Sequence, residues 1–266
     1  MKLLSAACLT FVLLLFLALA IDLAVQGGGA LSAGYLTDGV RDAGRAGGVA
    51  PVLVSTLAVL ALSLALATPL SLCGALLCSE ILRKHPRLSA LARRSFDALV
   101  SVPSIAVGLV GWALLSRAFG FSFSLFSGGL TLAVMLVPVM TVAFLNGLDG
   151  VSPGLRSEGL AVGLTRWQTV WQLLLPSARP ALLAGLVLAV GRATAETAVL
   201  ILTSGISARM PQSLLDPGAT LAVHVYHMAR NVPGGSAAAY RAALLLLMIN
   251  LVLHAALTTL RRERVQ

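Results

Sequence analysis

The sequence predicts an all-α, polytopic membrane protein with six transmembrane helices. Hydrophobic residues make up 58% of its 266 residues and charged residues only 11%, and the mean hydropathy is +0.94. A water-soluble domain of this size carries more charge, because charged side chains cover its surface. The hydrophobic residues are also concentrated in six long runs, and about 20 apolar residues in a helix cross a bilayer.

The six runs cover residues 3–25, 51–82, 96–115, 128–145, 180–204 and 242–260. The first contains Ala18-Leu19-Ala20, whose small residues are typical of a signal-peptidase site. Its apolar core is longer than the about 7–15 residues of a signal peptide, so we expect a helix that stays attached. The third run contains Ser101-Val102-Pro103-Ser104, which predicts a helix interrupted inside the membrane, where the break faces protein or water.

Basic residues in the segments between the runs predict the orientation. Alternate segments form a set of twelve and a set of six. The larger set is Lys2, Arg83, Lys84, Arg87, Arg93, Arg94, Arg156, Arg166, Arg179, Arg261, Arg262 and Arg264, and the smaller is Arg41, Arg45, Arg117, Arg209, Arg230 and Arg241. Cytoplasmic segments carry the excess of Lys and Arg, so both termini and the segment 146–180 are predicted to be cytoplasmic. The net charge of +9 is thus a feature of membrane topology, and we expect no nucleic-acid partner.

The motifs exclude several kinds of enzyme. Lys2 and Lys84 are the only lysines and neither follows a glycine, so the chain has no phosphate-binding Gly-Lys loop and cannot itself hydrolyse a nucleotide. No Ser-x-x-Lys, His-Glu-x-x-His or Gly-x-Ser-x-Gly motif occurs either. His224 and His227 are three residues apart, but no third ligand stands beside them, so we expect a surface pair and no metal site.

Arg192 and Glu196 lie near the middle of the fifth run and are candidate functional residues. A charge at bilayer depth costs about 2.5–3.5 kcal/mol on insertion scales and is a functional candidate for that reason. The i,i+4 spacing places both side chains on one face of a helix, within pairing distance. We expect an ion pair that lines a translocation path. The alternative is a structural pair that fixes helix packing.

The polar segment 146–180 precedes the fifth run and contains Trp167 and Trp171, one helical turn apart. Gly163 is placed for a turn between two short helices, which lets them fold back on each other. We expect the tryptophans to present an aromatic face to a groove in a partner. The alternative is an aromatic belt at the membrane surface.

This segment resembles the cytoplasmic loop of bacterial ABC importer permeases, whose pattern is Glu-Ala-Ala, three residues, Gly, nine residues and Ile-x-Leu-Pro. Nine residues also separate Gly163 from the sequence Leu173-Leu174-Leu175-Pro176, so the spacing and the Leu-Pro ending match. The Glu-Ala-Ala positions are Ser157, Glu158 and Gly159, so the acidic residue is displaced by one. The resemblance implies an ATPase-coupling loop formed by Glu158, Gly163, Trp167, Trp171, Leu175 and Pro176.

The fifth run resembles phosphate importer permeases, in which Ala-Arg-Ala-x-Gly-Glu-Thr-Ala-Pro precedes a small-residue turn. The matching residues are Arg192, Ala193, Glu196, Thr197 and Ala198, and the departing residues are Gly191, Ala195 and Val199. Because Ala195 and Val199 stand where the family has Gly and Pro, we expect a straighter helix here. The resemblance is closest to the second permease subunit (PstA-type).

The resemblance implies a type I, MetI-like ABC importer permease of the bacterial inner membrane. Residues 1–50 are then the first helix and a periplasmic loop, 51–260 the permease domain with the coupling loop 146–180, and 261–266 a cytoplasmic basic tail. The implied partners are a second permease subunit, a cytoplasmic ATPase dimer that uses ATP, a periplasmic phosphate-binding protein and membrane lipid. The chain itself is expected to bind no cofactor. Alternatives are import of another oxyanion (sulfate, molybdate or phosphonate) or a non-transporting sensor or scaffold.

Overall fold

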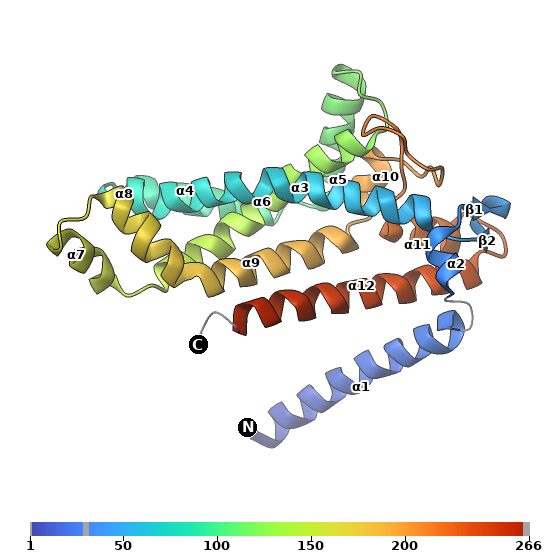
Figure 1. Cartoon of the computed structure of the whole chain (residues 1–266), viewed down its shortest axis with the longest axis horizontal. Helices are drawn as coiled ribbons and strands as arrows, with labels where there is room; N and C mark the ends of the chain where they lie inside the picture. Colours follow the sequence, from blue (N-terminus) through green and yellow to red (C-terminus); the bar gives the residue numbers. More distant parts are fainter. Residues whose placement is uncertain (1, 29–31, 263–266) are drawn as a thin grey trace.

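The structure is a computed structural model that describes residues 2–28 and 32–262, and its helices run mostly along one long axis (Figure 1). The larger helices are α1 (Lys2–Gly27), α3 (Ala50–Leu76), α4 (Pro86–Val100), α5 (Ser104–Gly111), α6 (Leu125–Asp149), α7 (Pro153–Ala161), α9 (Leu175–Ala195), α11 (Leu221–Arg230) and α12 (Ser236–Arg262). Shorter helices are α2 (Ala33–Thr37), α8 (Arg166–Thr169) and α10 (Ala198–Thr203). Helix α3 is extended by a wide turn, η3 (Leu77–Ile81), and a tight turn, η4 (Leu82–Lys84). Wide turns also extend α5 at η5 (Trp112–Ala118) and α8 at η6 (Val170–Leu174). The predicted all-α class is confirmed.

Five helices of the described chain are long and apolar enough to cross a membrane, namely Ser5–Gly27, Ala50–Lys84, Leu125–Asp149, Arg166–Ala195 and Ser236–Ala256. A sixth span results if Pro86–Val100 and Ser104–Ala118, which are bent by 91° relative to each other, count as one. The bend lies at residues 101–103, as the sequence predicts, because Pro103 has no N–H to continue the helix and disfavours helical geometry in Val102. The basic segment between the second and third runs is largely helical, since α4 begins at Pro86.

The core forms around α6, which packs against α3, α4, α5, α9 and α10. Leu132, Leu136 and Met140 of α6 are fully buried. Small residues let the neighbouring backbones approach: a Cβ on Gly128 would lie 2.7 Å from Cβ of Ser204, and one on Gly129 would lie 2.6 Å from Cδ2 of Leu62. Such close contacts replace the hydrophobic driving force that is missing between helices in lipid.

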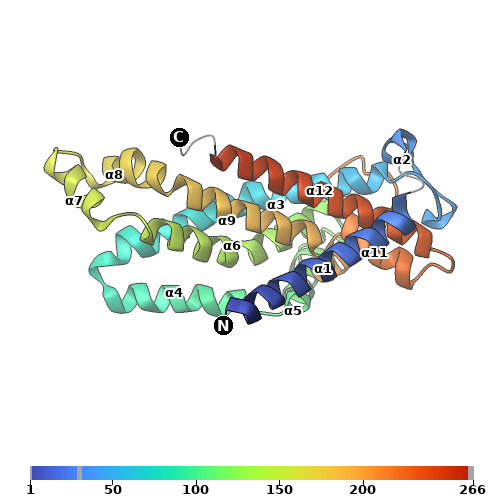
Figure 2. The ribbon, with the colours of Figure 1, turned by 90° about the horizontal axis from the view of Figure 1, so that it is seen from below.

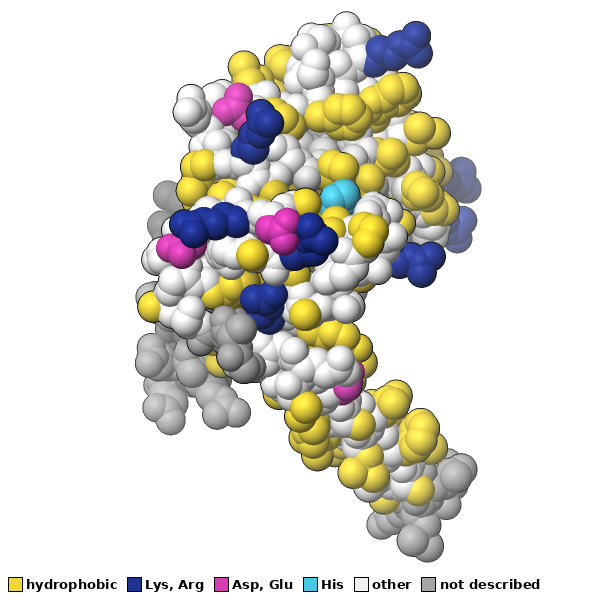
Figure 3. Space-filling model, turned by 90° about the vertical axis from the view of Figure 1, so that its right-hand side faces the viewer, with side chains coloured by type: hydrophobic (Ala, Val, Ile, Leu, Met, Phe, Trp, Pro, Cys, Tyr) yellow, Lys and Arg dark blue, Asp and Glu magenta, His cyan; other side chains and the backbone are white. Residues whose placement is uncertain are grey.

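Helix α1 is exposed along nearly its whole length and packs against α12. Its contact with the bundle is tightest at its C-terminal end, where a Cβ on Gly27 would lie 2.7 Å from the Tyr240 carbonyl oxygen. Figure 3 shows the rest of α1 projecting from the body with hydrophobic side chains on its surface. Most of the α1 surface is therefore available for contact with lipid or with another helix.

The bundle end opposite α7 and α8 carries α2, α11 and a small ladder of β1 (Val40–Arg41) and β2 (Ala46–Gly47) around the turn η2 (Asp42–Gly44). Arg241 of α12 holds these pieces together, because its guanidinium lies 5.8 Å above the Tyr35 ring and its Nη2 donates to the Arg45 carbonyl at 3.1 Å. Burial raises the pKa of Tyr35, so its phenol is neutral, and Arg241 contacts the face of the Tyr35 ring. Acidic and basic side chains alternate on this end of the molecule (Figure 3).

The expected surface pair of histidines is wrong for His224. This side chain is only 3% exposed, because α11 packs against α12 and α3, and burial lowers its pKa to about 4 with a further contribution from His227. Among the described residues no group of three or more His, Cys, Asp or Glu side chains is placed to hold a metal ion.

Basic residues gather at both ends of the bundle. Arg83, Lys84, Arg156 and Arg166 line one cavity beside α7 and α8, whereas Arg45 and Arg241 meet at the opposite end. The start of α1 and the end of α12 both point toward the α7 end (Figure 1, Figure 2). Residues 263–266 of the predicted basic tail lie outside the described residues.

Candidate functional site

The predicted functional residues fall in two places. One is the α7–α8 hairpin (residues 153–174) with the first turn of α9, and the other is the last turn of α9 with the break before α10 (residues 196–197). In the hairpin, α7 ends in a Schellman motif: Gly163 N–H donates to the Leu160 carbonyl at 3.1 Å, and Leu164 N–H donates to the Gly159 carbonyl at 3.0 Å. Gly163 has φ +87°, a left-handed conformation that favours glycine. The predicted turn at Gly163 is confirmed.

Helix α8 begins with a capping box at Thr165. Its Oγ1 accepts from Gln168 N–H at 3.3 Å, and the Gln168 side chain accepts from Thr165 N–H at 2.8 Å. Trp167 and Trp171 are 53% and 60% exposed, so this part of the hairpin presents two large aromatic side chains to the surroundings. A free aromatic surface of this kind marks a contact site for a partner or for the membrane boundary.

The second helix of the hairpin is longer than expected, because residues 166–195 form one continuous helix. Pro176 lies exposed in the first turn of α9 and cannot donate to the preceding turn, which fits the wide turn η6 directly before it. Leu174 is 1% exposed and Leu175 packs against the main core. The Leu-Pro ending thus attaches the hairpin to the bundle.

Glu158, at the displaced acidic position, is exposed, and no ion pair of this residue occurs in the described chain. Gly159 follows it where the family has alanine. A Cβ there would lie 2.8 Å from the Thr169 side chain, so glycine allows α7 to pack directly on α8. The departure at residue 159 therefore has a packing reason.

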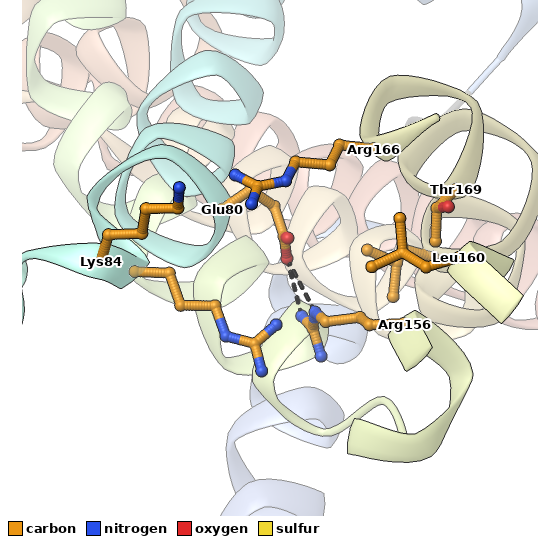
Figure 4. A pocket seen from close by; sticks show the side chains of 8 residues that line it. Glu80, Lys84, Arg156, Leu160, Arg166 and Thr169 are labelled. Carbon is orange, nitrogen blue, oxygen red and sulfur yellow. Dashed lines mark hydrogen bonds and ion pairs between the residues drawn. The ribbon is translucent and has the colours of Figure 1, made fainter. Parts of the chain in front are cut away.

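An ion pair that the sequence does not reveal fixes the hairpin to α3. Arg156 of α7 donates from Nε and Nη2 to Glu80 Oε1 at 3.0 and 2.8 Å, and the two side chains are only 14% and 17% exposed (Figure 4). Glu80 lies in η3, at the end of the second apolar run. The position of Glu80 at the end of an apolar run indicates that its carboxylate needs a partner. The sequence does not identify Arg156 as that partner, because 76 residues separate the two.

The predicted ion pair of Arg192 and Glu196 is wrong. Helix α9 ends at Ala195, Glu196 has φ −73° and ψ 125°, and the described residues form no ion pair between Arg192 and Glu196. Glu196 is 8% exposed and its Oε1 accepts from Val199 N–H at 3.4 Å, so the carboxylate caps the start of α10. The expected straighter helix is also wrong, because this cap supports a break without the usual Gly and Pro.

Arg192 is exposed on α9, and it forms no ion pair within the residues that the structure describes. Two positions further, Thr194 Oγ1 donates to Asn250 Oδ1 at 2.6 Å and joins α9 to α12. A guanidinium without an acid partner has all its donors available for a planar oxyanion, which it binds bidentately.

The helices that follow the two breaks, α5 and α10, pack on each other. Helix α5 packs on α10, where a Cβ on Gly108 would lie 2.9 Å from Cα of Val199 (Figure 1). Interrupted helices within a membrane occur where the backbone lines a cavity or is covered by protein, and they are typical of solute pathways in transporters. Glu196 lies at the break after α9, and Arg192 lies one helical turn before it.

Comparison with known proteins places the chain. Residues 67–265 match the family described as "Binding-protein-dependent transport system inner membrane component". "Probable ABC transporter permease protein YqgI" of Bacillus subtilis is 28% identical over 77% of this chain and 74% of its own length. "Phosphate transport system permease protein PstA" of Haemophilus influenzae is 28% identical over 75% of this chain and 70% of its length, and PstA 1 of Mycobacterium tuberculosis (strain H37Rv) is 32% identical over 61% and 52%.

Solved structures show the same fold. A chain of the inward-facing MetNI methionine ABC transporter has a TM-score of 0.62 and 16% identity, with 81% of this chain and 94% of that chain covered. A chain of a bacterial ABC transporter that imports the acidic polysaccharide alginate has a TM-score of 0.68 and 15% identity, with 98% and 95% covered. The solved structures show the fold, and the family match over residues 67–265 shows that the chain belongs to the binding-protein-dependent transport system inner membrane components.

Proposed function

We propose that this permease forms, with a second permease subunit, the pathway for inorganic phosphate in an ATP-driven importer. The observation that carries the proposal is Arg192, an exposed guanidinium in an apolar helix without an acid partner in the described chain. Phosphate offers such a group a bidentate partner. The PstA proteins of Haemophilus influenzae and Mycobacterium tuberculosis, both named as phosphate transport permeases, support this substrate.

The α7–α8 hairpin is the proposed docking element for a cytoplasmic ATPase dimer. Exposed Trp167 and Trp171 suit a groove in a partner, and the turn at Gly163 brings α7 against α8. Docking in this position requires the α7 end of the bundle to face the cytoplasm, in agreement with its excess of basic residues. A periplasmic phosphate-binding protein then delivers the anion at the opposite end.

Replacement of Arg192 tests the substrate pathway. We expect Arg192→Gln to abolish phosphate uptake in cells or proteoliposomes while the assembled complex and its ATP hydrolysis persist. Arg192→Lys should retain little uptake, because an ammonium lacks the planar fork of the guanidinium. Arg179→Gln is the matched control, since Arg179 is an exposed arginine of the same helix near its polar start.

The outcomes separate the alternatives. Normal phosphate uptake by the Arg192→Gln variant removes Arg192 from the pathway, and loss of the protein from the membrane in both Arg192 variants assigns it a structural role. Uptake of sulfate, molybdate or phosphonate by the wild-type complex in place of phosphate identifies another oxyanion as the substrate. A purified chain without an associated ATPase indicates a sensor or scaffold.

A further inference from the structure

A basic cavity lies between the end of α3 and the α7–α8 hairpin. It has a volume of about 330 Å³ and is lined by Glu80, Arg83, Lys84, Arg156, Leu160, Arg166, Thr169 and Leu174. Four of these side chains are basic and one is acidic. The basic groups come from η3–η4, α7 and α8, and Figure 4 shows Arg156 and Arg166 extending toward Glu80 from different elements.

The single carboxylate does not neutralise this cavity. Glu80 accepts two hydrogen bonds from Arg156, whereas Arg83, Lys84 and Arg166 form no ion pair within the described part of the chain. The nearby Asp149 is paired with Arg93. Like charges that share one cavity repel one another, and a bound anion relieves that repulsion.

We propose that this cavity binds a phosphate group, carried either by inorganic phosphate or by the headgroup of an anionic phospholipid. Phosphate oxygens accept from Arg and Lys together, and Arg contributes the planar fork. Either inorganic phosphate or a lipid headgroup could supply this phosphate group. A second hollow of about 480 Å³ shares Lys84 and includes Arg87 and Leu88, and Leu88 and Leu91 of α4 are exposed beside it for acyl chains.

The occupant would join the α7–α8 hairpin to α3. Arg83 and Lys84 belong to the end of α3, and Arg166 begins α8, so one anion that contacts all three bridges the two elements. Trp167 and Trp171 do not line the cavity. A protein partner on the tryptophans and an anion in the cavity therefore use different faces of α8, and the anion would set how firmly the hairpin is held.

The inference requires the permease fold and is independent of which solute is imported. To separate the cavity from the proposed pathway, all binding is measured in the full-length Arg192→Gln background. Arg83→Gln with Arg166→Gln removes two charges from the cavity. Arg94→Gln with Arg179→Gln removes two charges from exposed arginines that do not line it.

Two probes distinguish the sources. Isothermal titration calorimetry with inorganic phosphate in a neutral detergent detects binding of the free anion. Native mass spectrometry from nanodiscs of equal phosphatidylglycerol and phosphatidylcholine content detects a retained headgroup. We expect at least one probe to bind saturably, with affinity or retention reduced about tenfold or more in the cavity variant and unchanged in the control.

Three results would overturn the proposal. The first is that neither probe binds. The second is an equal loss in the cavity and control variants, which indicates a general effect of net charge. The third is a structure of the assembled complex in which an acidic side chain of a partner fills the cavity. None of these results bears on phosphate uptake, so the proposed function stands or falls separately.

Discussion

At the scale of single residues, Gly163 controls the shape of the α7–α8 hairpin. A Cβ there would meet nothing within 4 Å, so a substitution acts through the backbone conformation at φ +87° and not through a clash. A β-branched residue in this conformation costs about 1–2 kcal/mol or more. We expect Gly163→Val to insert in the membrane normally and to lose ATPase association and transport.

Gly163→Asn is the control, because asparagine tolerates the left-handed conformation. Co-purification of the ATPase and solute uptake are the measurements. A Gly163→Val protein with normal association and uptake would contradict the assignment of the hairpin as a docking element.

His224 predicts a dependence of stability on pH. Burial lowers its folded-state pKa to about 4, below the ordinary value of about 6.5. A base with a lowered pKa resists protonation in the folded state, so its contribution to stability is complete above pH ~6.5 and is lost as the pH falls toward 4. We expect the Tm of the purified protein to decrease over this range.

A comparison of two variants identifies the group. His224→Gln should flatten the pH dependence of the Tm between pH 6.5 and 4, whereas His227→Gln should leave most of it in place, because His227 is less buried. An unchanged pH profile in the His224→Gln variant would assign the effect to other groups.

At the scale of elements, the Glu80–Arg156 ion pair anchors the hairpin to α3. Loss of either partner should cost about 1–3 kcal/mol, since a mostly buried charge is left without its hydrogen bonds. The two losses should differ. Arg156→Gln leaves Glu80 among Arg83, Lys84 and Arg166, whereas Glu80→Gln leaves only cations, so Glu80→Gln should lower the Tm further.

The double variant completes the cycle. Glu80→Gln with Arg156→Gln should be more stable than the sum of the single losses predicts, by the coupling energy of the pair. Additive losses would show that the pair contributes nothing to the attachment of the hairpin.

The elements also show which parts of the structure the sequence predicts. The long apolar runs, the break at Pro103 and the turn at Gly163 follow from local rules on helix length, proline and positive φ. The expected Arg192–Glu196 pair does not form, because the buried Glu196 carboxylate accepts from Val199 N–H in the following helix while Arg192 is exposed. The Glu80–Arg156 pair could not be predicted, because it depends on how α7 folds back on α3.

At the scale of the whole molecule, the orientation remains a prediction. With both termini and the α7 end cytoplasmic, a cysteine at Gln168 should react with an impermeant thiol reagent in inside-out vesicles, and a cysteine at Thr37 should react in intact spheroplasts. Cys8, Cys73 and Cys78 are first replaced by serine, because Cys8 and Cys73 are exposed. The opposite labelling pattern would invert the topology.

The mass of the purified protein tests whether α1 stays attached to the mature chain. Intact-mass measurement should give the full chain, because the apolar core of α1 exceeds the length of a signal peptide and the helix continues without interruption to Gly27. A mass without about the first twenty residues would show that the segment is cleaved.

The uninterrupted helix from Arg166 to Ala195 has a mechanical consequence. Thirty residues of helix span about 45 Å. The exposed tryptophans sit at one end of this helix and Glu196 follows directly after the other, where the chain changes direction. In the proposed docking, a displacement of the end that carries the tryptophans would act along this helix on the break at residues 196–197. The proposed docking surface and the break at residues 196–197 therefore lie at the two ends of one helix.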